Sequence, residues 1–172
     1  GSEMCIRDSA INAAYIRALP AEEFRRLADP FIDSAVHCSI DRDLLCANLQ
    51  PRCEVLEDIP PQLDFFDAVL PIDAEMYRNK KQKTTPESAK EALTALLPVL
   101  EAQTDWSRDA IFEACKQKAE AMEKKNGWLL FPLGIALSGK ARTPGGGTDL
   151  ACMMGREKTL QRVQDAIAKL NG

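Results

Sequence analysis

The chain has 172 residues, of which 45% are hydrophobic and 28% charged, a balance typical of a globular protein rather than of a disordered one. Its longest uncharged apolar stretch, residues 127–139, is too short to cross a bilayer and contains Pro132, so we expect no membrane-spanning segment. The formal net charge of −4 argues against a generic nucleic-acid binder, which is usually basic.

The beginning of the chain is set apart from the rest. Residues 4–8 read Met-Cys-Ile-Arg-Asp, which looks like the translation of a sequencing adapter. The segment also lacks the apolar stretch of a signal peptide. We therefore expect residues 1–9 to be adapter-derived, with the true reading frame starting near Ala10 in the rear part of a longer gene product.

Helical spacing and helix-breaking residues predict short helices through the first half of the chain. Helices are expected over residues 13–19, 21–28 and 31–40, with Asp29-Pro30 as a break between the last two. Asp41 opens a further helix that Pro51 should kink or split.

The middle of the chain has weaker signals. Pro60-Pro61 predicts a turn, and the aromatic pair Phe65-Phe66 follows it. Residues 69–85 are mixed and contain a short helical candidate at 73–78. We interpret this segment as a hinge between two halves.

The second half begins more clearly. Thr85 precedes Pro86 at a first helical position, and leucines recur at helical spacing over residues 93–100. A helix over 108–125 should close at Asn126-Gly127. Residues 128–137 are apolar and short, so their periodicity fits a helix or a buried strand equally.

The last part of the chain predicts a loop and two more helices. The loop covers residues 139–147, and the helices cover residues 149–154 and 157–170. Because alternating strand patterns are nearly absent, the sequence predicts an all-α fold. We expect two small helical bundles in tandem, residues 10–84 and 85–172.

Known catalytic and metal-binding motifs are absent from the sequence. It contains no GxxxxGK[ST], GxGxxG, HExxH or GxSxG motif, and the glycines at 145–147 indicate a tight turn instead. The cysteines form no CxxC pair, and His37 has no second histidine to complete a zinc site. We therefore expect no catalytic and no metal site in these residues, and the unpatterned thiols indicate a reducing, cytoplasmic setting.

The overall charge averages two unlike parts of the chain. Residues 1–115 carry 12 basic and 21 acidic side chains, whereas residues 116–172 carry 10 basic and 5 acidic ones. A basic end of this kind indicates a surface that faces a polyanion. A solvated helical surface that is rich in lysine explains the charge equally well.

Four blocks of sequence, spread over residues 11–170, resemble the C-terminal region of bacterial glutamyl-tRNA synthetases. Residues 133–139, 142–146 and 154–163 are similar to the family's Pro-Leu-Arg-x-Ala-Leu-Thr-Gly stretch, its Thr/Ser-Pro-Gly loop and its Leu-Gly-Lys-Glu-x-x-Leu-x-Arg helix. Upstream, residues 12–17 are similar to Leu-Asn-x-x-Tyr-Ile. Residues 50–66 are similar to the Arg-x-x-x-Leu-x-Glu block with its Phe-Phe pair.

The resemblance implies the stem-contact and all-helical anticodon-binding regions of a class I glutamate–tRNA ligase. In that family the chemistry lies in an N-terminal Rossmann-type domain with His-Ile-Gly-His and Lys-Met-Ser-Lys-Ser signatures, and neither occurs here. ATP and Mg²⁺ are thus expected only in that catalytic domain, with no cofactor bound by these residues. The expected partners are tRNA(Glu) and the catalytic domain of the same polypeptide, in a cytoplasmic monomer.

The resemblance also assigns contacts to the anticodon. Arg52 matches an arginine that reads the first anticodon base, and its planar fork suits a base edge, although an ordinary exposed helical arginine is the alternative. Thr143 and Pro144 match loop residues that contact base edges and pack on a base. Phe131 lies where an aromatic ring could stack on a base or simply pack in the core.

Basic residues near the same loop are the remaining candidates. Lys140 and Arg142 are expected to meet phosphates, which would position the loop without reading sequence. Lys116, close to Lys118, lies near a basic position of the family.

Three glycines depart from the family's pattern. Gly134 stands where the family has a second anticodon-reading arginine, and the loss of a bidentate contact would cost about 1–3 kcal/mol of discrimination. Arg142 could substitute from the loop. Gly146 and Gly147 occupy positions that usually carry apolar side chains, so an apolar contact is also lost.

A second interpretation is a non-enzymatic helical protein-interaction module. In that case Leu93, Leu97 and Leu100 would dock a partner helix instead of packing in the core. This interpretation predicts a large exposed apolar patch and no cationic surface around residues 143–147.

Overall fold

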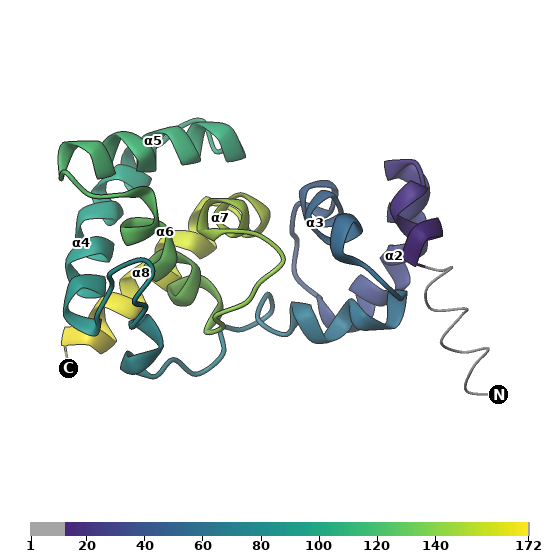
Figure 1. Ribbon diagram of the computed structural model, residues 1–172, viewed down its shortest axis with the longest axis horizontal. Helices are drawn as coiled ribbons and strands as arrows, with labels where there is room; N and C mark the ends of the chain where they lie inside the picture. Colours follow the sequence, from purple (N-terminus) through teal and green to yellow (C-terminus); the bar gives the residue numbers. More distant parts are fainter. Residues whose placement is uncertain (1–12, 172) are drawn as a thin grey trace. The chain divides into compact units, whose positions relative to one another are not determined.

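The computed structural model describes residues 13–171, and its regular secondary structure in this range consists of helices joined by loops (Figure 1). No strand is formed between residues 13 and 171, where the extended pairing consists of one bridge between Asn79 and Thr84. The chain divides into two compact units, Gly1–Ala68 and Val69–Gly172. The predicted all-α fold is confirmed, whereas the expectation for residues 1–9 lies outside the described residues.

The first unit combines three α-helical segments with three short 3₁₀ helices. Residues 13–18 are helical and precede the named elements, which are α2 (Ala21–Ala35), α3 (Arg42–Leu49), η1 (Gln50–Arg52), η2 (Leu56–Asp58) and η3 (Pro60–Leu63). The core contains Phe65 and Phe66, both fully buried, with ring centroids 4.4 Å apart. The turn predicted at Pro60-Pro61 is the first turn of η3.

Helix α2 corrects the predicted break at Asp29-Pro30. It runs without interruption from Ala21 to Ala35 with Pro30 inside it, and residues 36–40 are not helical. Proline removes one backbone hydrogen bond. The apolar stripe of Phe24, Ala28 and Ile32 is completely buried on both sides of that point. This tertiary burial outweighs the local signal, as it does for most helices in proteins.

Pro51 splits the following helix, as expected. The Oδ1 of Asp41 accepts a hydrogen bond from the backbone N–H of Leu44 at 3.0 Å and caps α3, which ends at Leu49. Pro51 then lies inside η1, and Arg52 is the last residue of that short helix. Arg52 is exposed.

Asp67 closes the first unit through hydrogen bonds to the segment after α2. Its Oδ1 accepts from the backbone N–H groups of His37, at 2.7 Å, and Cys38, at 3.2 Å, and its Oδ2 lies 2.6 Å from His37 Nδ1. These bonds, led by the His37 backbone N–H, lower the pKa of Asp67 from 3.8 to about 2. Because the folded pKa lies below the unfolded one, the Asp67 carboxylate stabilises the fold above about pH 4, and this contribution is lost as pH falls through about 2.

An Asp67→Asn variant should therefore lose less stability on acidification than the natural chain does. We expect the free energy of unfolding, from urea titrations at pH 5 and pH 2.5, to fall less steeply in the variant. Glu54→Gln, which removes an exposed carboxylate from the same unit, is the matched control and should keep the natural pH dependence. Equal acid sensitivity in all three proteins would show that Asp67 is not responsible.

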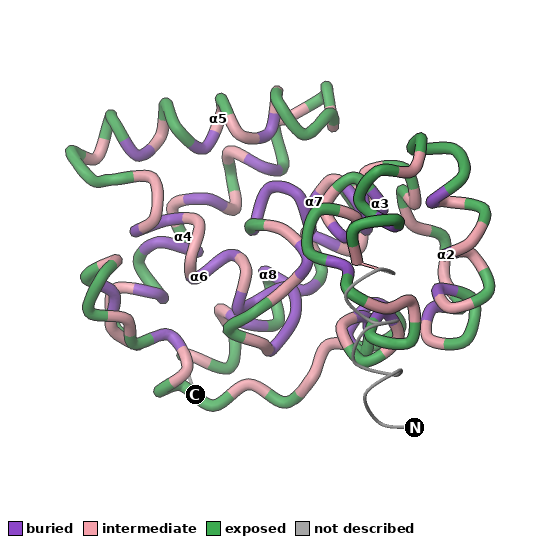
Figure 2. The backbone as a smooth tube through the Cα atoms, turned by 45° about the vertical axis from the view of Figure 1, so that its right-hand side comes forward, coloured by how far each residue is buried: buried purple, intermediate pink, exposed green. Residues whose placement is uncertain are grey.

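The second unit is a bundle built around one buried helix. Its elements are η4 (Ala74–Tyr77), α4 (Pro86–Ala102), α5 (Arg108–Ala121), α6 (Asn126–Ser138), α7 (Gly147–Met154) and α8 (Arg156–Asn171). Helix α6 packs against α4, α5, α7 and α8 and is buried over most of its length (Figure 2). The ambiguous apolar stretch of residues 128–137 is thus a core helix, and burial on all sides explains its missing periodicity.

Local capping explains where two of these helices begin and end. Thr85 Oγ1 accepts from Ser88 N at 3.1 Å, which confirms the predicted start of α4. The predicted end of α5 is wrong, because Asn126 and Gly127 begin α6 instead of closing α5. Helix α5 stops at Ala121, and Glu123 adopts a left-handed conformation with φ of 57°.

Residues 69–84 pack with the second unit. Tyr77 is buried, Thr84 Oγ1 donates to its carbonyl oxygen at 2.7 Å, and the Leu70 N–H donates to Ser138 O at 3.2 Å. The short helix predicted at 73–78 is the 3₁₀ helix η4. The division into 10–84 and 85–172 stays a prediction about domain organisation.

The leucine stripe of α4 faces the core. Leu93 and Leu100 are fully buried, and Leu97 is half-buried. Across residues 13–171, Tyr15 is the exposed large hydrophobic side chain, at 61% of its surface. The protein-interaction interpretation therefore loses the apolar patch on which it depended. None of the helices in the described part of the chain has the length and apolar character needed to cross a bilayer.

Candidate nucleic-acid interface

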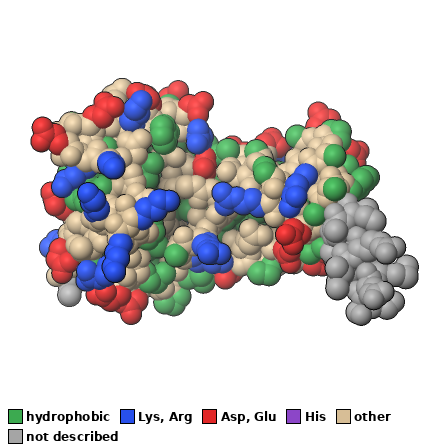
Figure 3. All heavy atoms as spheres, viewed as in Figure 1, with side chains coloured by type: hydrophobic (Ala, Val, Ile, Leu, Met, Phe, Trp, Pro, Cys, Tyr) green, Lys and Arg blue, Asp and Glu red, His purple; other side chains and the backbone are tan. Residues whose placement is uncertain are grey.

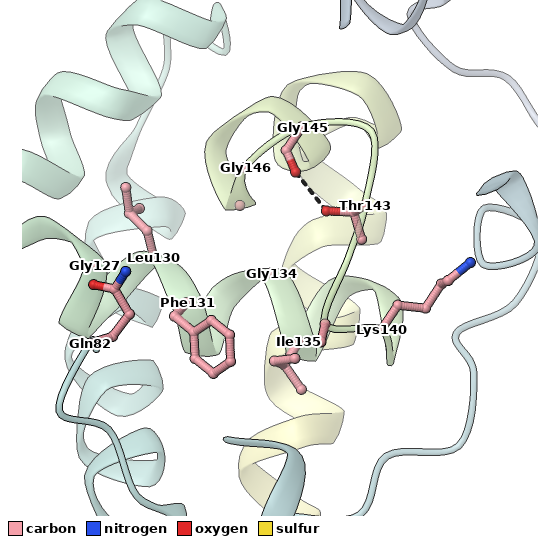
Figure 4. A pocket seen from close by; sticks show the side chains of 12 residues that line it. Gln82, Gly127, Leu130, Phe131, Gly134, Ile135, Lys140, Thr143, Gly145 and Gly146 are labelled. Atoms are coloured by element: carbon pink, nitrogen blue, oxygen red, sulfur yellow. Dashed lines mark hydrogen bonds between the residues drawn. The ribbon is translucent and has the colours of Figure 1, made fainter. Parts of the chain in front are cut away.

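A surface pocket of about 230 Å³ lies where α6 meets the loop that connects it to α7 (Figure 4). It brings together four of the predicted site residues, Phe131, Lys140, Thr143 and Gly146. The other lining residues come from α6, the same loop, the start of α7 and the turn before α4: Gly127, Leu130, Gly134, Ile135, Ala141, Gly145, Gly147 and Gln82.

The first part of the loop is held by hydrogen bonds of its own. Ser138 Oγ donates to Gly134 O at 2.6 Å and accepts from the Lys140 N–H at 3.0 Å. Thr143 Oγ1 donates to Gly145 O at 2.6 Å, a bond drawn in Figure 4. Because the Thr143 proton is used inside the loop, its oxygen is left to act as an acceptor toward a base edge.

Asp149 fixes the far end of the loop. Its Oδ2 accepts from the Gly146 N–H at 3.0 Å, and its Oδ1 accepts from Arg108 Nε at 2.7 Å. The Asp149 side chain is only 12% exposed, so the carboxylate of this charge-assisted pair is shielded from water, whereas the Arg108 side chain is 46% exposed. Asp149 and Arg108 were not expected here from the sequence, although the spacing of Gly146 and Asp149 is that of a capping motif.

Two facing glycines shape the floor of the pocket in different ways. A Cβ on Gly147 would lie 2.9 Å from Leu130 O and 3.2 Å from Gly134 N, so only glycine lets α7 begin this close to α6. A Cβ on Gly134 would lie 3.9 Å from its nearest neighbour, Gly147 N, which is ordinary contact. At the position of the family's second arginine, this chain therefore presents backbone without a side chain.

The predicted residues Phe131, Lys140 and Pro144 differ in how far they are exposed to solvent. Phe131 is half-buried, so both base stacking and core packing remain open for its ring. The Lys140 ammonium extends away from the other labelled side chains (Figure 4). Pro144 does not line the pocket and is buried, so the expected packing of its ring on a base stays a prediction that requires the loop to open.

Besides Pro144, three predicted residues do not line the pocket. Arg142 is exposed on the loop itself. Lys116 is exposed on α5, and Lys118, two residues further on, is half-buried. Arg52 belongs to the first unit. Their predicted contacts with RNA are untested by the pocket geometry.

Arg162 anchors the helix from which the loop departs. It is 7% exposed, and its Nη1 donates to Leu137 O at 2.6 Å, in the last turn of α6. Carbonyls in a last helical turn have no partner within the helix, and a cation is favourable there. Sequence reasoning missed this role, although Arg162 ends the Leu-Gly-Lys-Glu-x-x-Leu-x-Arg block.

Few ionisable side chains line the pocket. Of its lining side chains, Lys140 is the one that titrates, and the remaining polar groups are an amide, a hydroxyl and backbone atoms. Elsewhere between residues 13 and 171 no cluster of His, Cys, Asp and Glu is arranged to hold a metal ion. Burial raises the pKa of Cys46 to about 11 and that of Cys115 to about 12, as expected for core thiols.

Comparison with known proteins gives matches over nearly the whole described chain. The model of a family described as anticodon binding domain matches residues 13–167. The chain is 41% identical over 160 residues to a glutamate–tRNA ligase from Clostridium botulinum, covering 93% of this chain and 33% of the relative. A glutamate–tRNA ligase from Clostridium tetani is 38% identical with the same coverage. The chain thus spans about a third of the length of the curated relatives that it matches.

A solved structure supports the fold. The crystal structure of a glutamate tRNA ligase from Elizabethkingia meningosepticum in complex with its amino acid superposes with a TM-score of 0.78 at 24% identity, covering 94% of this chain and 32% of that one. These matches confirm the resemblance that the sequence blocks indicated. Since the family model covers nearly the whole described chain, the protein belongs to the family of anticodon-binding domains.

Proposed function

We propose that this chain binds the anticodon arm of tRNA(Glu) as part of a glutamate–tRNA ligase. The observation that carries the proposal is the pocket between α6 and the α6–α7 loop, which gathers Phe131, Thr143 and Gly146 in a chain of the anticodon-binding family. Its role would be to hold the tRNA while a catalytic part of the same polypeptide esterifies it with glutamate.

The pocket has the features that an unpaired base requires. Loop bases of RNA are splayed out, stacked on aromatic planes and read through hydrogen bonds at their edges. Phe131 offers a partly exposed ring, and the Thr143 oxygen and the loop backbone offer polar atoms. Gly134, which lines the pocket, has no side chain that would fill the space at this point.

The proposal includes the cellular location, the oligomeric state and the cofactors of the protein. We place it in the cytoplasm as a monomer, and we assign ATP and Mg²⁺ to the catalytic part of the ligase and not to these residues. Sedimentation equilibrium with and without tRNA(Glu) tests the monomer directly.

The decisive experiment compares tRNA(Glu) with an unrelated tRNA. We expect the chain to prefer tRNA(Glu) in filter-binding titrations, and Arg52→Ala to weaken that complex about tenfold, the effect of losing one base contact. Arg26→Ala is the matched control, because it removes a positive charge from the same unit at a side chain that is 68% exposed and paired with Glu23. It should bind as the natural chain does.

Two results would count against the proposal in different ways. Equal affinity for tRNA(Glu) and the unrelated tRNA would refute the proposal that the chain recognises tRNA(Glu). An Arg52→Ala variant that binds like Arg26→Ala would leave the tRNA assignment standing but would remove Arg52 from the interface.

A further inference from the structure

A second pocket, of about 310 Å³, adjoins the loop pocket and is lined by lysines. Lys81 and Lys83 come from the turn before α4, and Lys124 and Lys125 come from the loop between α5 and α6. We call these four residues the lysine pocket. Figure 3 shows basic side chains gathered over this part of the second unit, with acidic ones mainly toward the margins of the view.

The lysine pocket carries a positive charge that the protein itself does not neutralise. All four lysines are exposed, and none of them forms an ion pair with another residue of the range 13–171. Two arginines of the same unit behave differently, since Arg78 pairs with Glu75 and Arg108 with Asp149. Charge on this surface is therefore available to a partner.

The neighbours of the lysines only partly offset this charge. Glu123 is the one carboxylate among the residues that line the pocket. The Lys124 ammonium lies 4.9 Å from the centroid of the Trp128 ring, a cation–π contact that orients it without removing its charge. A net excess of positive charge remains.

Two residues that line the lysine pocket adopt a left-handed backbone conformation, which is costly for residues other than glycine. Lys83, with φ of 59°, and Glu123, with φ of 57°, are the non-glycine residues with positive φ in the described chain, and both line this pocket. Glycine adopts such a conformation at the least cost. The turn at Lys83 is already closed by the bridge between Asn79 and Thr84, so turn geometry does not require a lysine there.

The two pockets are adjacent on the surface of one unit. Gln82 lines both of them, and the neighbouring residues Gly127 and Trp128 of α6 line one each. An RNA strand that places a base in the loop pocket can therefore reach the lysine pocket with the phosphates of neighbouring nucleotides.

We propose that the lysine pocket binds phosphate groups of the RNA whose base occupies the loop pocket. The inference rests on the proposed function. Ammonium groups on flexible stems suit phosphate oxygens, and contacts of this kind fix the register of an RNA without reading its sequence. The lysine pocket supplies affinity and position, and the loop pocket supplies selectivity.

The test uses two RNA hairpins with the same stem, one with the tRNA(Glu) anticodon loop and one with a scrambled loop. Lys81→Gln/Lys125→Gln should bind both hairpins about tenfold more weakly at 50 mM salt, and the slope of log affinity against log salt should fall by about 1.5. Lys90→Gln/Lys169→Gln removes equal charge from exposed lysines of another surface of the same unit and should bind as the natural chain does.

The same titrations separate this inference from the proposed function. If the natural chain does not distinguish the hairpins but the lysine variant still weakens both, the proposed function fails and the phosphate site stands. If the lysine variant binds both hairpins as its control does, the phosphate site is refuted, as it would be if the lysines served an acidic protein partner. Failure of the natural chain to bind either hairpin at 50 mM salt would also refute it.

Lys83→Gly provides an internal check on folding. Glycine relieves the left-handed backbone while removing the charge, so this variant should be at least as stable as the natural chain. We expect about threefold weaker binding of both hairpins and a salt slope lower by about 0.8. Unchanged binding in this variant would show that the Lys83 ammonium does not contact RNA.

Discussion

Arg162→Ala is expected to lower the free energy of unfolding of the second unit by about 3 kcal/mol. The Arg162 guanidinium is buried and donates a 2.6 Å hydrogen bond to the Leu137 carbonyl. Truncation removes this charge-assisted bond, leaves a buried acceptor without a partner and opens a cavity between α8 and α6. Each of these changes destabilises the end of α6, from which the loop of the candidate site departs.

Urea unfolding followed by tryptophan fluorescence measures this effect in the second unit alone, because both tryptophans, Trp106 and Trp128, belong to it. Lys169→Ala is the control, since it removes an exposed cation from the same helix. Its unfolding midpoint should stay close to that of the natural chain. If Arg162→Ala were equally stable, the bond to Leu137 would contribute nothing to the fold.

Gly147→Ala should lower the unfolding free energy by about 2 kcal/mol, the usual cost of forcing an extra carbon into a well-packed contact. The new Cβ would lie 2.9 Å from Leu130 O, and a backbone oxygen cannot move aside by changing a rotamer. Helix α7 must then shift away from α6. Because the loop ends at Gly147, we also expect weaker binding of the anticodon hairpin.

Gly134→Ala is the opposing control on the facing helix. Its Cβ would make ordinary contacts at 3.9 and 4.0 Å, and alanine is a better residue than glycine inside a helix. The same fluorescence titration should show a rise in stability of up to about 1 kcal/mol. Destabilisation by both alanines would mean that helix α6, not the Gly147 contact, is the sensitive element.

Local signals in the sequence predicted the fold where capping residues are strong. Thr85 and Asp41 begin their helices as expected, because each side chain satisfies a backbone N–H of the first turn. The prediction failed at Pro30 and at the end of α5. In the first case tertiary burial of the α2 stripe overrides the proline, and in the second Glu123 adopts a conformation that glycine normally marks.

The candidate site was only partly accessible from the sequence. Family resemblance located the loop of residues 142–146, and the structure gathers Phe131, Thr143 and Gly146 around one pocket. Family resemblance could not reveal Gln82, which lines the pocket from a turn far away in the chain. The support that Asp149 gives the loop was hidden as well, because its partner Arg108 lies 41 positions earlier.

The anchoring of α6 by Arg162 also sets an order of events during synthesis. Helix α8 is translated after the other described helices, yet it packs against α4 and α6 and supplies the buried side chains of Thr159, Arg162 and Val163. Until α8 has left the ribosome, the end of α6 lacks its partner and the loop lacks its fixed base. A nascent chain therefore acquires a firmly held loop only once α8 has been made and has packed against α6.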